Sequence, residues 1–280
     1  MSTDGSRPSK TTRSARQSTG SSTRTGTKAA KPAVLLSVDH LRQAIGRQRI
    51  LRDISFELDA EELVVLAGRN GAGKSTLLRC LAGWQRPASG KVIIEGLDLL
   101  ANEREARQHV ILVPDTPDFY LELTAWEHLV FVARSQRIED WKEPAEELLD
   151  HFGLWEQRDA YPHTFSRGMR YKLGLSLALM VEPALLLLDE PFGPIDPISA
   201  ERLWSDLGVY RDAGMGILLS SHQLPPGVAP DRYILMDSGR ILGDGSPAEL
   251  ADELDVGRRS GLDALLLAAV RRDELARHGG

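Results

Sequence analysis

The chain has 280 residues, of which 42% are hydrophobic and 26% are charged, and its formal net charge is −6. This composition is ordinary for a soluble globular protein, and the length allows one large domain with a subdomain or two small domains. The single Cys80 excludes an intramolecular disulfide. The longest apolar stretch, "LGLSLALMVEPALLLL", contains Glu182 and Pro183 and falls short of the roughly 20 uncharged residues of a membrane span.

Residues 1–31 differ in composition from the remainder. They are rich in Ser and Thr and contain no Val, Ile, Leu, Phe, Tyr or Trp. Their charge is +6, which leaves −12 for the rest of the chain; the charged residues are Asp4, Arg7, Lys10, Arg13, Arg16, Arg24, Lys28 and Lys31. We predict a disordered basic tail, because such a segment buries too little apolar area to offset its ordering entropy. Three roles are possible for this tail: a solvated arm without a partner, a segment that docks on anionic lipid, or a target of phosphorylation.

From residue 32 the pattern becomes globular. "AVLLSVDHL" and "ILRDISFELDAEE" predict strands, the second because Ile54, Phe56 and Leu58 alternate with polar residues. "LVVLAG" predicts a short, fully buried strand, followed by a glycine-rich loop. "KSTLLRCLAG" predicts a helix that Gly83 ends, and "KVIIEGLDLL" and "VILVP" predict further strands.

Residues 115–183 predict mainly helices: "TAWEHLVFVARSQ", "EPAEELLDHFGL" and "MRYKLGLSLALM". Strands and helices alternate again from "ALLLLDEP" through "SAERLWSDLGVYRDAG" to "MGILLSSH". A hairpin around residues 237–240 and two short helices, near 247–254 and 260–276, complete the chain. This alternation indicates an α/β fold with a parallel sheet and crossover helices. The predicted domains are the tail (1–31), a globular domain (32–250) with its helical part at about 115–183, and a C-terminal helical extension (251–280).

"GRNGAGKST" fits the phosphate-loop pattern G-x-x-x-x-G-K-[ST] and stands between a predicted buried strand and a predicted helix. Glycines let backbone N–H groups wrap phosphates, and the helix N-terminus adds positive partial charge. Lys74 is predicted to face the β- and γ-phosphates, and the Ser75 hydroxyl is predicted to ligate Mg²⁺. The predicted nucleotide-binding residues are Gly68, Arg69, Asn70, Gly71, Ala72, Gly73, Lys74, Ser75 and Thr76.

Two carboxylates follow the buried run "LLLL" that begins at residue 185. They stand at the carboxyl end of a predicted strand, where open α/β sheets bind their ligands. Asp189 is predicted to hold Mg²⁺, and Glu190 is predicted to orient or deprotonate the attacking water.

With "TFSRGMRYK", "FGPIDP" and "LLSSHQL" in this order, the chain resembles the ATP-binding cassette (ABC) family of transport ATPases over residues 33–250. The resemblance implies a P-loop NTPase fold with a parallel-sheet core, an N-terminal antiparallel β subdomain and an inserted helical subdomain. It also implies that two cassettes pack head to tail. The signature turn of one chain, here Ser166, Arg167 and Gly168, then caps the γ-phosphate held by the other.

The resemblance gives roles to three further residues. Asp115 stands where the family carries a Gln that reaches Mg²⁺ and the attacking water and senses the permease. Asp196 matches the Asp of the loop that crosses the dimer interface. His222 matches the switch His that contacts the γ-phosphate. Catalytic roles are thus expected for Glu190, His222 and Asp115, with Ser75, Asp189 and Asp115 as metal ligands.

Three positions depart from the family's pattern. Arg167 stands in place of a Gly, where its Cβ excludes some backbone geometries and its charge faces an anion. Asp115 replaces the Gln, and an ionised carboxylate cannot donate a hydrogen bond. No aromatic residue precedes the strand near residue 50, where Ile45 is the nearest match to the base-stacking position. Weaker stacking and looser selectivity for adenine are the expected consequences.

The resemblance is strongest to the ATP-binding subunits of exporters whose permease is a separate chain. It implies ATP and Mg²⁺ as cofactors, an integral-membrane permease and a second ABC ATPase subunit as partners, no nucleic acid, and a place on the cytoplasmic face of the cell membrane. The alternative is a soluble or regulatory nucleotide-dependent binding module with weak ATPase activity. A soluble ABC ATPase of translation or DNA repair is disfavoured, because the chain has one phosphate loop and no long heptad run.

Overall fold

The computed structural model describes residues 34–258 and 260–278. The prediction of a basic tail at residues 1–31 therefore lies outside the described residues. Among the helices of these described residues, none combines the length and the apolar composition that a membrane span requires.

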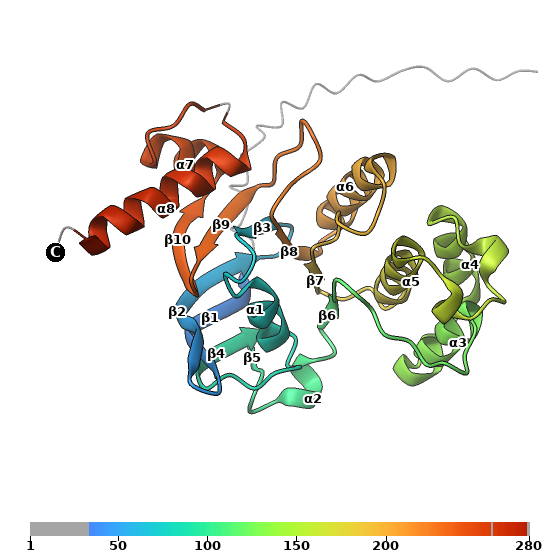
Figure 1. The fold of residues 1–280 in the computed structure, drawn as a ribbon. Helices are drawn as coiled ribbons and strands as arrows, with labels where there is room; N and C mark the ends of the chain where they lie inside the picture. The colour runs from blue at the N-terminus through green and yellow to red at the C-terminus, as the bar shows by residue number, and fades with distance from the viewer. Residues whose placement is uncertain (1–33, 259, 279–280) are drawn as a thin grey trace, which may run out of the picture. The chain divides into compact units, whose positions relative to one another are not determined.

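A six-stranded, mostly parallel sheet forms the centre of the domain (Figure 1). Its strands in spatial order are β10 (Arg240–Gly245), β9 (Arg232–Asp237), β3 (Leu63–Gly68), β8 (Gly216–Ser221), β7 (Leu185–Asp189) and β6 (Val110–Val113). Only the β9–β10 pairing is antiparallel, and it forms the predicted hairpin. The parallel strands have continuous apolar sequences, without polar alternation, because both faces of this sheet are covered. Leu63, Val65 and Ala67 of β3 join one hydrophobic cluster, whereas Val64 and Leu66 join the other.

A second, antiparallel sheet covers one face together with the helix that follows the phosphate loop. Its strands in spatial order are β2 (Gln48–Asp59), β1 (Val34–Ile45), β4 (Ser89–Ile94) and β5 (Leu97–Asp98). The stretch predicted as one strand from residue 91 is divided into β4 and β5, because the backbone turns at Glu95 and Gly96, both with positive φ. Cys80 lies buried in the helix α1 (Lys74–Leu81), where burial raises the pKa of its thiol to about 11.

The other face carries the remaining long helices. These are α3 (Ala125–Gln136), α4 (Lys142–His151), α5 (Arg167–Leu179), α6 (Pro197–Asp212) and α8 (Leu262–His278). Shorter helical segments are α2 (Glu103–Ala106), η1 (Trp155–Gln157), η2 (Pro162–Thr164) and α7 (Pro247–Glu253). The chain leaves the parallel sheet after β6, forms α3, α4 and α5, and returns to the sheet at β7 (Figure 1). This excursion is the predicted helical subdomain.

Candidate nucleotide site

The phosphate loop joins β3 to α1 as predicted, and close packing explains its glycines. A Cβ atom at Gly68 would lie 2.3 Å from the carbonyl oxygen of Met236, a distance that no side chain tolerates. Gly73 is the N-cap of α1 with a φ of 106°, in the left-handed region that favours glycine. No side chain caps α1, so its first N–H groups stay available to an anion at the helix N-terminus.

Lys74 is held as the predicted phosphate-binding cation should be. Its side chain is only 6% exposed, and its ammonium donates to the Gly68 carbonyl oxygen at 2.7 Å. The same ammonium lies 3.1 Å from Glu190 Oε1. A buried ammonium with one carbonyl and one carboxylate partner can exchange the carboxylate for phosphate oxygens, so these contacts fit a nucleotide-binding role.

Ser75 and Asp189 lie together across the ends of α1 and β7. The Ser75 hydroxyl donates to Asp189 Oδ1 at 3.1 Å, and the buried Ser220 hydroxyl donates to the same oxygen at 2.7 Å. A hydroxyl beside a carboxylate is an oxygen set that suits Mg²⁺. The described residues contain no group of three or more His, Cys, Asp or Glu side chains that could hold a metal. Phosphate and water oxygens would therefore have to complete the shell, which is how Mg²⁺ binds in many nucleotide sites.

Glu190 and His222 form a pair at the same edge of the sheet. Glu190 Oε2 accepts a hydrogen bond from His222 Nδ1 at 2.8 Å and one from the His222 backbone N–H at 3.3 Å. Burial alone would raise the pKa of the Glu190 carboxyl. The hydrogen bond from His222 and the charge of Lys74 outweigh burial, and the pKa lies below its ordinary value. The backbone of Glu190 is left-handed, with a φ of 49°, a strained conformation that recurs at functional sites.

The signature turn stands at the start of α5. Ser166 is the N-cap, and its hydroxyl oxygen accepts from the Met169 backbone N–H at 3.2 Å. The helix therefore begins at Arg167, two residues before the predicted start, because the Ser166 cap closes the first turn. A Cβ at Gly168 would lie 2.8 Å from the Pro194 carbonyl oxygen, so a glycine is needed here. Among the described residues, no hydrogen bond or ion pair joins this turn to the phosphate loop of its own chain.

Asp196 is connected to α5, the helix that follows the signature turn, through the side chain of Ser199. Asp196 is the N-cap of α6 and accepts from the Ser199 backbone N–H and hydroxyl, at 3.0 and 2.6 Å. These hydrogen bonds lower the pKa of the Asp196 carboxyl. Lys172 of α5 donates to the Ser199 hydroxyl at 3.0 Å. The signature turn and the predicted dimer loop are thus neighbours on one part of the surface.

Asp115 contacts a residue of its own chain's signature turn. Its carboxylate accepts a hydrogen bond and ion pair from the Arg167 guanidinium of the same chain. Its predicted contacts with Mg²⁺ and water stay predictions. Ile45, the nearest match to the base-stacking position, is 58% exposed at the end of β1.

The sequence reasoning missed two buried hydroxyls. Ser220 not only donates to Asp189 but also accepts from the Glu190 backbone N–H at 3.0 Å, and so positions both carboxylates. The Tyr171 hydroxyl of α5 is fully buried and has no hydrogen-bond partner among the described residues. Burial raises the pKa of Tyr171, and Asp189 and Asp115 raise it further. For Ser220 the available signal was a polar residue at the end of the apolar run "GILL", whereas Tyr171 stands between two basic residues, where the sequence gives no such signal.

Comparisons with known proteins agree with this site. Residues 51–193 match the family model described as ABC transporter. The ABC-type transporter ATP-binding protein EcsA of Bacillus subtilis is 31% identical over 85% of this chain and 98% of its own length. The Nod factor export ATP-binding protein I of Rhizobium meliloti is 32% identical over 84% of this chain and 71% of its own.

A solved structure of the ATP-binding subunit of an ABC transporter superposes with a TM-score of 0.78 and is 31% identical. The alignment covers 84% of this chain and 99% of that one. The predicted fold, an ABC ATPase with an antiparallel N-terminal sheet and a helical subdomain, is confirmed. The chain belongs to the ABC transporter family as an ATP-binding subunit, the component that hydrolyses ATP to power transport.

Proposed function

We propose that the chain powers export through a separate membrane permease, on the cytoplasmic face of the cell membrane, and that it works with Mg²⁺ as a head-to-tail dimer. The contact of Glu190 with both Lys74 and His222 carries the ATPase part of the proposal, because a carboxylate, a cation and an imidazole then lie together beside the phosphate loop. Export is supported by the similarity to the Nod factor export protein.

In the proposed reaction, Lys74 turns its ammonium from Glu190 to the β- and γ-phosphates. Glu190 loses one of the two partners that lower its pKa and becomes a stronger base, able to take the proton of the attacking water. His222 keeps the other carboxylate oxygen oriented. Ser75 and Asp189 would hold Mg²⁺, which neutralises charge on the phosphate oxygens.

The permease is proposed to dock on a groove beside the Asp115 segment. The groove has a volume of about 680 Å³, and its wall includes Trp84, Tyr120 and Phe131, which are 52%, 57% and 47% exposed. Tyr120 and Phe131 form an edge-on ring pair with centroids 5.3 Å apart. Exposed aromatic side chains in a polar rim are typical of a protein–protein contact. Thr116 and Pro117 line the same groove, so docking there acts directly on the segment that carries Asp115.

We expect Mg²⁺-dependent ATP hydrolysis by the purified chain, and faster hydrolysis in proteoliposomes that contain its permease. Phe131→Glu should abolish the stimulation and leave the basal rate unchanged, because it places a charge in the docking groove but lies outside the nucleotide site. The exposed Val209→Glu change on α6 serves as the control and should keep the stimulation. If the permease still stimulates Phe131→Glu, the groove is not its docking site. If neither preparation hydrolyses ATP, the proposed ATPase activity is wrong.

The direction of transport is tested in cells that lack the chain. If it powers export, a compound should accumulate inside the mutant cells and disappear from their medium, as measured by mass spectrometry of both fractions. Accumulation in the medium, with loss from the cells, would show import.

A further inference from the structure

Two departures from the family's sequence pattern meet in the structure. Arg167 at the signature turn and Asp115 after β6 are 52 residues apart in sequence, yet the guanidinium donates to the carboxylate. Their side chains are 51% and 39% exposed, so water and other ligands can reach the pair. An exposed ion pair of this kind stabilises its state by a factor of only about 1.4 to 5, so a stronger partner can open it.

The pair is the polar end of a longer contact between α5 and the Asp115 segment. Two turns further along α5, a Cβ at Gly174 would lie 3.0 Å from Pro117 Cγ and 3.3 Å from Val113 Cγ1. Gly168 approaches the Pro194 carbonyl oxygen with similar closeness. The start of α5 is therefore fixed to the segments that follow β6 and β7, and a displacement of Asp115 would be transmitted to the signature turn.

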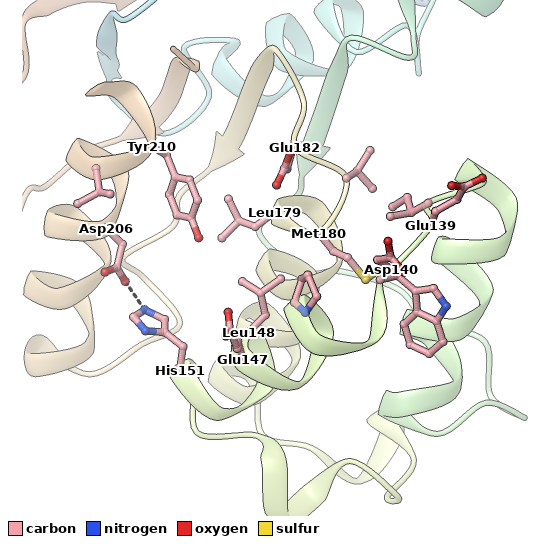
Figure 2. Close-up of a pocket in the computed structure, with 15 residues that line it drawn as sticks. Glu139, Asp140, Glu147, Leu148, His151, Leu179, Met180, Glu182, Asp206 and Tyr210 are labelled. Atoms are coloured by element: carbon pink, nitrogen blue, oxygen red, sulfur yellow. Dashed lines mark hydrogen bonds and ion pairs between the residues drawn. The ribbon is translucent and has the colours of Figure 1, made fainter. Parts of the chain in front are cut away.

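Elsewhere the helical subdomain is separated from the core by a crevice. Figure 2 shows this crevice, of about 690 Å³, between α4, the end of α5 and α6. His151 of α4 points toward Asp206 of α6 across it, with Nε2 and Oδ2 2.7 Å apart (Figure 2). The crevice lies at the end of α5, whereas the Arg167–Asp115 pair lies at its start, so this pair can influence where the signature turn stands.

We propose that the Arg167–Asp115 ion pair is a latch that holds the signature turn in its ATP-free position and opens when the γ-phosphate bound by the partner chain takes the guanidinium. This inference rests on the proposed head-to-tail dimer. A guanidinium binds phosphate oxygens through two parallel hydrogen bonds, and phosphate is therefore the stronger partner.

The latch links the two nucleotide sites of the dimer. Asp115 is expected in the site formed by its own phosphate loop, whereas Arg167 is expected in the site of the partner chain. Opening the pair at one site releases a carboxylate at the other, so the second ATP meets a chain whose latch is already open. Binding at the two sites should accordingly be cooperative.

The test is a double-mutant cycle on ATP-driven dimerisation in the Glu190→Gln background, where turnover does not consume the nucleotide. Asp115→Ala should lower the dimer dissociation constant about 2- to 25-fold at saturating ATP and Mg²⁺, because two latches no longer oppose closure. The same change should have no such effect when Arg167 is already Gly. Any direct effect of Asp115 on Mg²⁺ cancels in this comparison. Asp206→Ala removes a polar link between α6 and His151 of α4, in a different part of the helical subdomain. It is the matched control and should leave the constant unchanged.

Sedimentation equilibrium measures the dissociation constants. Hydrogen exchange of the first α5 amides in ATP-free protein measures whether the ion pair holds the start of this helix. Exchange there should be faster in Asp115→Ala than in the parent. The latch would be overturned, with the dimer left intact, if Asp115→Ala did not change the dissociation constant. It would also be overturned if the change were the same with Arg167 and with Gly at position 167. A Glu190→Gln parent that binds ATP but does not dimerise would overturn the head-to-tail dimer and the latch together.

Discussion

Replacing Lys74 with Ala is expected to weaken Mg-ATP binding by about 100-fold or more. The side chain is buried at the start of α1 and carries the charge that is predicted to face the β- and γ-phosphates. A hydrogen bond to a charged group contributes about 1.5–3 kcal/mol, and Lys74 is placed to make more than one. Its removal also leaves Glu190 without its cationic partner, so the pKa of that carboxyl should rise.

Isothermal titration calorimetry with ATP and Mg²⁺ measures this loss. Lys91→Ala is the control, because Lys91 is an exposed lysine paired with Asp98 at 3.5 Å and lies outside the phosphate loop. It should bind ATP like the unmodified protein. An unchanged affinity in Lys74→Ala would contradict the assignment of the phosphate loop.

Glu190→Gln is expected to slow ATP hydrolysis by about 10²- to 10⁴-fold while ATP still binds. Glutamine keeps the shape of the side chain and can still contact Lys74 and His222, but it cannot accept the proton of the attacking water. Lys74, Ser75 and Asp189 are untouched, so the phosphates and Mg²⁺ should keep their ligands.

Phosphate release in single-turnover experiments measures this rate. Glu62→Gln is a matched control, because Glu62 is also 20% exposed and is also ion-paired, to Arg232 at 2.7 Å. Hydrolysis by Glu62→Gln should stay near the rate of the unmodified protein. A Glu190→Gln variant that hydrolyses ATP at the unmodified rate would remove Glu190 from catalysis.

The sequence predicted the parts of the site that local pattern determines. The phosphate loop follows from the spacing of Gly68, Gly73 and Lys74 between a buried strand and a helix. Asp189 and Glu190 could be predicted because they come directly after an apolar run, and such a run is typical of a strand whose two faces are both buried. These features depend on neighbours in sequence, and the structure brings all of them together.

The missed features depend on tertiary packing. The sequence predicts Asp115 beside Mg²⁺ and Arg167 at the signature turn, but nothing in either segment indicates that the two side chains pair across 52 positions. The start of α5 was misplaced because the Ser166 cap, rather than helix propensity, decides it. Ser220 could not be assigned either, since its contacts with Asp189 and Glu190 arise only when β7 and β8 pair.

The central claim, a nucleotide site completed by the signature turn of a second chain, is tested most directly by the mass of the Glu190→Gln variant with ATP and Mg²⁺. Light scattering during size-exclusion chromatography should give a dimer. Adding Ser166→Asp should return it to a monomer that still binds ATP, because Asp keeps the helix cap of α5 but sets a negative charge against the partner's γ-phosphate. The same change at Ser246, the N-cap of α7, should leave the dimer intact. A variant that binds ATP but stays monomeric, alone and with its permease, or a dimer that tolerates Ser166→Asp, would contradict the account.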